Sequence, residues 1–172
     1  MIKQNLYIVL LGGKHENANI EVHDIIPIIA SDIPSSFPYF QQQWFGLKNG
    51  LHVDSWMNIN GVSYQGKNYQ IHISDTPVET KELKLFLINL GAYIPEQFGE
   101  IHKYLVVAGI DENDAKDQGK LVIESNWLKP HTDAVLDIDD CLILQSINKQ
   151  FIQLSEGEFQ KNFYKNEYMI IK

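Results

Sequence analysis

One segment of this chain occurs twice. The residues LYIVLLGGKHENANIEVHD, which start at Leu6, align without a gap with LFLINLGAYIPEQFGEIHK, which start at Leu85. At this offset of 79 residues the aligned pairs include Gly12 with Gly91, Glu21 with Glu100, and His23 with His102. A repeat at a fixed offset predicts that the chain is built from two copies of one unit.

The apolar pattern predicts the same order of elements in both copies. The first copy is expected to contain strands at 6–11, 20–30, 52–60 and 69–74, with a helix after residue 36. In the second copy we expect strands at 85–90, 100–109, 137–144 and 150–154, a helix from 111 to about 127, and a last strand at 168–171. Alternating or continuous apolar runs of this length are typical of strands.

This order predicts an α+β fold, in which one helix per repeat covers a mostly antiparallel sheet. The unit is β-β-α-β-β, which is equivalent to two β-α-β-β-β modules if the cut is made at residue 20. The repeats are expected at residues 1–78 and 79–172, and we expect them to share one core as a single structural domain.

Single residues carry more specific expectations. Pro27 cannot donate to a β-ladder, so its strand should lie at a sheet edge or carry a bulge. Ser36 and Asp111 are suited to cap the two helices. Gly61 is expected in a turn between strands. The residues expected to face inward from the second helix are Ala115, Leu121 and Val122.

Composition excludes some partners. The net charge is −8, with a pI near 5.1, and an acidic surface disfavours nucleic acids and anionic membranes. The apolar run at 6–11 is far too short to cross a bilayer and lacks a signal-peptide cleavage pattern. Cys141 is the only cysteine, and we expect a packed thiol whose pKa the adjacent Asp139 and Asp140 raise. These features predict a cytoplasmic protein, and a homo-oligomer stays open.

The repeat singles out two Glu-x-His pairs. Glu21 and His23 lie two residues apart on a predicted strand, so their side chains face the same way, and Glu100 and His102 do likewise. If a pseudo-twofold axis relates the copies, the pairs meet near it and offer nitrogen and oxygen donors to a divalent metal. Three interpretations stay open: contacts that hold the copies together, a metal or small-molecule site, and acid–base catalysis.

A second candidate pair follows in the segment GLHVDSWM. His52 and Asp54 are again two residues apart, and Trp56 and Trp44 either line a ligand pocket beside them or pack in the core.

The counterpart of this pair in the second copy is ambiguous. An offset of 79 residues matches it with His131 and Asp133. The strand pattern instead favours a match between residues 54–57 and residues 139–142. A few inserted residues near Trp127 would reconcile the two alignments.

Seven segments together are similar to a bacterial family called domain of unknown function 1543. They are LLGG at 10–13, NIEVHD at 19–24, QQWFG at 42–46, GLHVDSWM at 50–57, INLGAY at 88–93, FGEIHKY at 98–104 and IDDCL at 138–142. The family pattern includes Glu21, His23, Trp44, His52, Asp54, Trp56, Glu100 and His102. This resemblance implies one or two copies of a short unit, here two, and implies no activity, substrate or cofactor.

Two classes of function follow. The chain has no complete catalytic motif, so we expect a soluble binding or interaction protein with a ligand site at the Glu-x-His strands. The alternative is a metal-dependent enzyme, because paired β-α-β-β-β modules resemble the architecture of vicinal-oxygen-chelate enzymes. In that architecture His23 and His102 lie on first strands, and Glu167 lies near the last.

Overall fold

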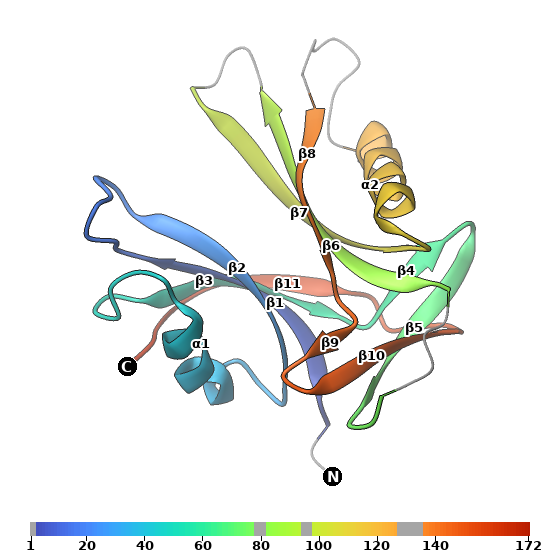
Figure 1. The fold of residues 1–172 in the computed structure, drawn as a ribbon, viewed down its shortest axis with the longest axis horizontal. Coiled ribbons are helices and arrows are strands. Elements are labelled where there is room, and N and C mark those ends of the chain that lie inside the picture. Colours follow the sequence, from blue (N-terminus) through green and yellow to red (C-terminus); the bar gives the residue numbers. More distant parts are fainter. Residues whose placement is uncertain (1–2, 78–81, 94–97, 127–135) are drawn as a thin grey trace. The chain divides into compact units, whose positions relative to one another are not determined.

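The computed structural model describes residues 3–77, 82–93, 98–126 and 136–172. These form a mixed α+β fold of mostly antiparallel sheets with two helices, which confirms the predicted class (Figure 1). The chain divides into two compact units. Unit 1 comprises Met1–Asn60, Ile147–Gln150 and Gln160–Lys172, and unit 2 comprises Gly61–Ser146 and Phe151–Phe159. The boundary between repeats at residues 78 and 79 lies outside the described residues and stays a prediction.

Unit 1 is a four-stranded antiparallel sheet in the order β11-β3-β1-β2. Its strands are β1 (Asn5–Gly13), β2 (Val22–Ala30), β3 (His52–Ile59) and β11 (Phe163–Ile170). A short 3-10 turn, η1 (Pro34–Ser36), leads into the helix α1 (Phe37–Gln43). β2 is an edge strand, so the missing amide of Pro27 leaves the interior ladder intact, as expected.

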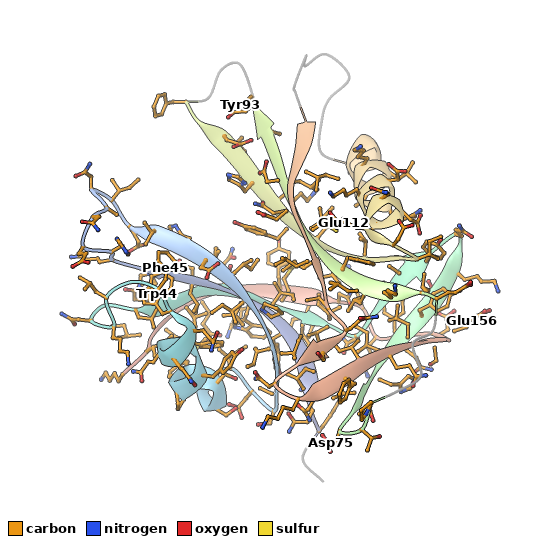
Figure 2. All side chains as sticks on the ribbon, in the orientation of Figure 1. Trp44, Phe45, Asp75, Tyr93, Glu112 and Glu156 are labelled. Atoms are coloured by element: carbon orange, nitrogen blue, oxygen red, sulfur yellow. The ribbon has the colours of Figure 1, made fainter. Side chains whose placement is uncertain are left out.

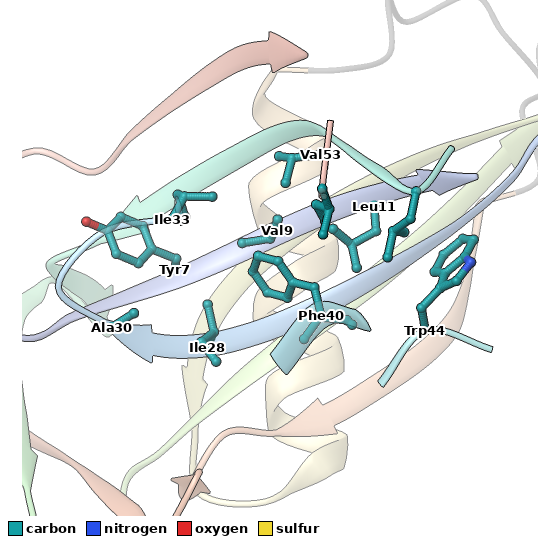
Figure 3. Close-up of a cluster of buried hydrophobic side chains, with 12 residues drawn as sticks. Tyr7, Val9, Leu11, Ile28, Ala30, Ile33, Phe40, Trp44 and Val53 are labelled. Atoms are coloured by element: carbon teal, nitrogen blue, oxygen red, sulfur yellow. The ribbon is translucent and has the colours of Figure 1, made fainter. Parts of the chain in front are cut away.

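One face of this sheet packs under α1. Tyr7, Val9 and Leu11 alternate along β1 and contact Phe40 of α1 in one buried cluster (Figure 3). Other members of the cluster are Ile26, Ile28, Ala30, Ile33, Trp44, Leu51, Val53 and Ile171. Because neighbouring residues of a strand point to opposite faces, the even-numbered residues of β1 face away from the helix.

Unit 2 contains a three-stranded antiparallel sheet in the order β7-β6-β8. Its strands are β6 (Lys84–Tyr93), β7 (Glu100–Gly109) and β8 (Leu136–Ile143), and α2 (Glu112–Asn126) packs against it. A further sheet has the order β4-β5-β10-β9, formed by β4 (Gly61–Tyr64), β5 (Lys67–Ser74), β10 (Gln150–Glu156) and β9 (Ser146–Ile147).

The caps and turns confirm some local expectations and overturn others. Asp111 caps α2, since its Oδ1 accepts the amide of Asp114 at 2.9 Å. Ser36 makes no side-chain cap bond, because the preceding 3-10 turn gives it a helical conformation from which the hydroxyl does not reach the next turn. Gly61 lies inside β4 rather than in a turn.

The expected inner face of α2 is partly wrong. Ala115 is fully buried, but Leu121 and Val122 are 59% and 41% exposed. The helix approaches the sheet through small residues in its first half, where a Cβ on Gly119 would lie 2.9 Å from Ile88 of β6. The close contact is made there, so the larger apolar residues further along the helix are left in solvent.

We expect Phe40→Ala to destabilise unit 1 by about 3–5 kcal/mol, because it empties the centre of the cluster beneath α1. Phe45→Ala is a matched control, since Phe45 is 54% exposed, and it should cost about 1 kcal/mol or less. Urea denaturation followed by far-UV circular dichroism measures both. Equal losses of stability would contradict the assignment of Phe40 to the core.

Candidate functional site

The registers of β1 bring two histidines to one glycine. Gly12 of β1 pairs with His23 of β2 on one side and with His52 of β3 on the other. A register shift in β3 places Asp54 as an unpaired residue of a β-bulge, between the partners of Leu10 and Leu11. Together with Glu21, which directly precedes β2, these side chains lie on the sheet face opposite α1. The unit 1 cluster is therefore Glu21, His23, His52 and Asp54.

Both imidazoles of the unit 1 cluster face carboxylates. His52 Nε2 lies 3.5 Å from Glu21 Oε1 and 3.3 Å from Asp54 Oδ1. His23 Nε2 lies 3.5 Å from Glu21 Oε1 and 3.3 Å from Asp54 Oδ2. The ligand atoms of Glu21, His52 and Asp54 all lie within 4.8 Å of one another, as metal ligands do.

His52 is the deepest member of the cluster. Its side chain is 3% exposed, against 46% for His23 and 47% for Glu21. Its Nδ1 lies 2.8 Å from the carbonyl of Gly50, and because a carbonyl only accepts, Nδ1 carries the proton. In the neutral ring Nε2 then presents a lone pair to the cluster. Despite the nearby carboxylates, neither His52 Nε2 nor Asp54 Oδ2 makes a hydrogen bond.

The ring of His52 is held on one face by an aromatic neighbour. Tyr168 of β11 stacks on it with ring centroids 4.4 Å apart and an interplanar angle of 36°. β11 carries an irregularity between Asn166 and Met169, and Tyr168 lies within it. Packing on the ring and the hydrogen bond at Nδ1 together fix where Nε2 points.

Gly12 forms the floor of the cluster. A Cβ at this position would lie 2.5 Å from both Asp54 Oδ2 and His52 Nε2. Distances this short are excluded for real side chains, so any residue other than glycine would displace the cluster. The conformation of Gly12 is ordinary for a strand, and the requirement for glycine comes from space alone.

Unit 2 has a second cluster in a matching register. Gly91 of β6 pairs with His102 of β7 and with Asp137 of β8, and a shift in β8 leaves Asp139 in the bulge. A Cβ on Gly91 would collide with Glu100 and would lie 2.7 Å from Asp139 Oδ2. The unit 2 cluster is Glu100, His102 and Asp139.

The two clusters differ in burial. His102 Nδ1 lies 3.3 Å from Asp139 Oδ2, and His102 Nε2 lies 3.8 Å from Glu100 Oε2. All three residues of the unit 2 cluster are exposed. The register position that His52 occupies in unit 1 is taken by Asp137 in unit 2. A buried imidazole such as His52 is therefore a property of unit 1 in the described part of the chain.

The structure joins residues that the sequence presented as separate pairs. Glu21 and His23 lie beside His52 and Asp54 because β1 runs between β2 and β3. Trp56 is placed elsewhere: it packs against the core beneath α1, with its ring centroid 5.7 Å from that of Tyr7. The meeting of Glu21 and His23 with Glu100 and His102 would involve both units and stays a prediction.

The bulge positions bear on the second copy's counterpart of Asp54. Asp54 and Asp139 occupy the same place in the registers of β3 and β8, which agrees with the alignment drawn from the strand pattern. His131 and Asp133 lie outside the described residues. Asp139 was missed as a cluster residue because the acidic run around it indicated a solvated strand end, although the alignment with Asp54 contained the signal.

Glu167 is engaged in other contacts. Lys165 Nζ lies 2.6 Å from its Oε1, and Trp56 Nε1 donates to its Oε2 at 3.2 Å. The hydrogen bond from Lys165, supported by that from Trp56, lowers the pKa of this carboxyl. Because both oxygens already have partners, Glu167 does not take the ligand role that the architectural analogy gave it.

Cys141 is a packed thiol rather than a nucleophile. It contacts the core beneath α2, and burial is the main cause that raises its pKa, followed by the charge of Glu112. The direction agrees with the expectation from sequence, but the cause differs, since the expected contributions of Asp139 and Asp140 are absent. A thiol with a raised pKa holds little thiolate at neutral pH.

We expect Gly12→Ala to destabilise the protein by about 1–3 kcal/mol, the usual cost of overpacking, because the added methyl competes with His52 and Asp54 for space. Gly119→Ala is a control, since its methyl meets the mobile end of Ile88 and alanine favours a helix. Thermal unfolding of the metal-free proteins measures the difference. If Gly12→Ala is as stable as Gly119→Ala, the cluster does not rest on Gly12 as described.

Comparison with solved structures places the whole chain near one other protein. It matches the crystal structure of a protein Il1583 from Idiomarina loihiensis with a TM-score of 0.74 and 26% sequence identity, over 99% of each chain. Comparison with curated proteins gave no match. Among the described helices, none is long and apolar enough to span a membrane.

The first part of the chain also matches a family profile. The matched residues, 18–73, contain the whole unit 1 cluster. The predicted form with two tandem copies is not part of this match and stays a prediction. Over residues 18–73 the comparison supports the family described as Domain of Unknown Function (DUF1543).

Proposed function

We propose that unit 1 binds a divalent transition-metal ion through Glu21, His52 and Asp54, with His23 beside them as a further nitrogen donor. The observation that carries this proposal is the unpartnered Nε2 of His52, which is buried and directed at two carboxylates. An imidazole and carboxylates within a few ångströms are a donor set for zinc, manganese, iron, cobalt or nickel.

A purely structural role accounts less well for the geometry. If the carboxylates held the histidines by hydrogen bonds, His52 Nε2 and Asp54 Oδ2 would be satisfied, yet both are buried without a hydrogen bond. A buried polar atom that lacks a partner costs about 1–3 kcal/mol. A cation between these atoms would satisfy both, and it would also offset the repulsion between the Glu21 and Asp54 carboxylates.

The environment of His52 supports the same interpretation. A histidine that ligates a metal usually donates its other ring N–H to a carbonyl or carboxylate, which fixes the tautomer and the ring orientation. The Nδ1 of His52 has such a partner in the Gly50 carbonyl, at 2.8 Å. The ring is therefore already arranged to offer Nε2 without reorganisation.

We further propose that the two clusters descend from one duplicated unit and have diverged. Supporting this are the repeat at an offset of 79 residues and the matching bulges at Asp54 and Asp139. Because an aspartate stands where unit 1 has His52, and because its donors are exposed, Glu100, His102 and Asp139 would hold a transition metal more weakly.

A metal-dependent enzyme is the second candidate function. It is favoured by the exposure of Glu21 and His23, 47% and 46%, because a catalytic metal must be reached by substrate. Turnover by the metal-loaded protein that is lost in His52→Ala and retained in His102→Ala would favour this candidate over a binding protein.

Isothermal titration of tag-free, chelator-treated protein with Zn²⁺, Ni²⁺ and Mn²⁺ tests the proposed site. We expect tight binding of one equivalent by the wild type. In His52→Ala the affinity should fall by more than the roughly 10–100-fold that the loss of a ligand's hydrogen-bond partner costs. His102→Ala is the matched control, since the same substitution in the unit 2 cluster should leave this binding event in place.

The two variants also decide between the clusters. If His102→Ala abolishes the tight event while His52→Ala retains it, the site belongs to unit 2 and the assignment to unit 1 is wrong. If the wild type binds none of the three ions, the proposal of a metal site falls. Circular dichroism of each variant confirms that it is folded.

A further inference from the structure

We infer that the metal bound by unit 1 keeps a solvent-facing coordination position, and that the ligand taken there is a small donor with no more than one negative charge. This inference rests on the proposed metal site. It concerns what the site binds rather than whether it binds a metal.

The burial of the donors gives the direction of the open position. His52 forms the deep side of the unit 1 cluster, and Gly12 closes the floor behind it. Glu21 and His23 are about half exposed, and Asp54 is 27% exposed. A metal in contact with all of these donors therefore has protein on one side and solvent on the other.

The number of donors leaves that position free. The ligand atoms of Glu21, His52 and Asp54 converge within 4.8 Å. Three protein donors leave one position on a four-coordinate ion and more on a six-coordinate ion. Even with His23 as a fourth ligand, an octahedral ion has two positions left. Closed structural sites differ, since protein side chains occupy every position there.

Charge limits what fills the open position. The carboxylates of Glu21 and Asp54 together balance a divalent cation, so the loaded site is close to neutral. The ion pairs formed by the cluster residues are all with one another among the described residues. The chain contains no arginine, the residue best suited to a bidentate grip on phosphate or a dicarboxylate. A multiply charged anion would therefore meet no additional cation in the cluster.

The rim of the cluster is partly apolar. Tyr168 lies against the His52 ring and is 64% exposed, and Ile20, next to Glu21, is 81% exposed. These side chains offer contact area and no charge. They suit a ligand with a single coordinating group and a neutral body better than a polyanion.

Cobalt-substituted protein tests the inference, because the visible absorption bands of Co²⁺ report on its ligands. Co²⁺ is added to chelator-treated wild-type protein, and the complex is titrated with azide, a small monoanion, and separately with phosphate at pH 7.5. We expect azide to shift the visible bands with saturation. Phosphate should bind at least tenfold more weakly than azide.

The outcomes separate this inference from the proposed function. If the Co²⁺ bands form and azide leaves them unchanged, the metal has no open position and the inference is wrong, while the metal site stands. If phosphate binds as tightly as azide or more tightly, the limit on charge is wrong. Failure of Co²⁺ to bind at all would remove the proposed metal site itself, and the inference with it.

Discussion

The hydrogen bond between His52 Nδ1 and the carbonyl of Gly50 determines what the rest of the unit 1 cluster can do. It fixes the tautomer, so the lone pair of the neutral ring lies on Nε2 and points at the carboxylates. The acceptor is itself held in place. Gly50 has a φ of +84°, and the next residue, Leu51, is fully buried, with its carbonyl accepting the amide of Ile171 at 3.0 Å.

The sheet of unit 1 divides its residues between two tasks. On one face, alternate side chains of β1, β2 and β3 build the core beneath α1. On the other face, at one end of the same strands, the polar residues of the unit 1 cluster gather above Gly12. The bulge at Asp54 brings one more carboxylate to that face without breaking the pairing of β3 with β1. Stability and ligand chemistry are thus carried by opposite faces of the same three strands.

The sequence predicted the class of fold and most of the elements, because runs of apolar residues are local signals. It also identified Glu21 with His23, and His52 with Asp54, as pairs on single strands. It could not predict that these pairs share one cluster, since this depends on the pairing of β1 with both β2 and β3. Registers between distant segments leave no local pattern.

Other failures have separate physical causes. Leu121 and Val122 have the spacing of an inner helix face, but α2 meets its sheet at Ala115 and Gly119, where small side chains allow close approach. Asp139 belongs to an acidic run that indicates a solvated strand end when it is considered by itself. Its equivalence to Asp54 depends on a bulge, which changes the offset between the copies within a single strand.

The most direct test of the account is a crystal structure of the protein grown with Co²⁺ or Zn²⁺, with diffraction recorded at the absorption edge of the metal. The account predicts an anomalous peak about 2.0–2.2 Å from His52 Nε2, within coordinating distance of the Glu21 and Asp54 carboxylates. A map with no peak there, or with a peak only at Glu100, His102 and Asp139, would contradict it.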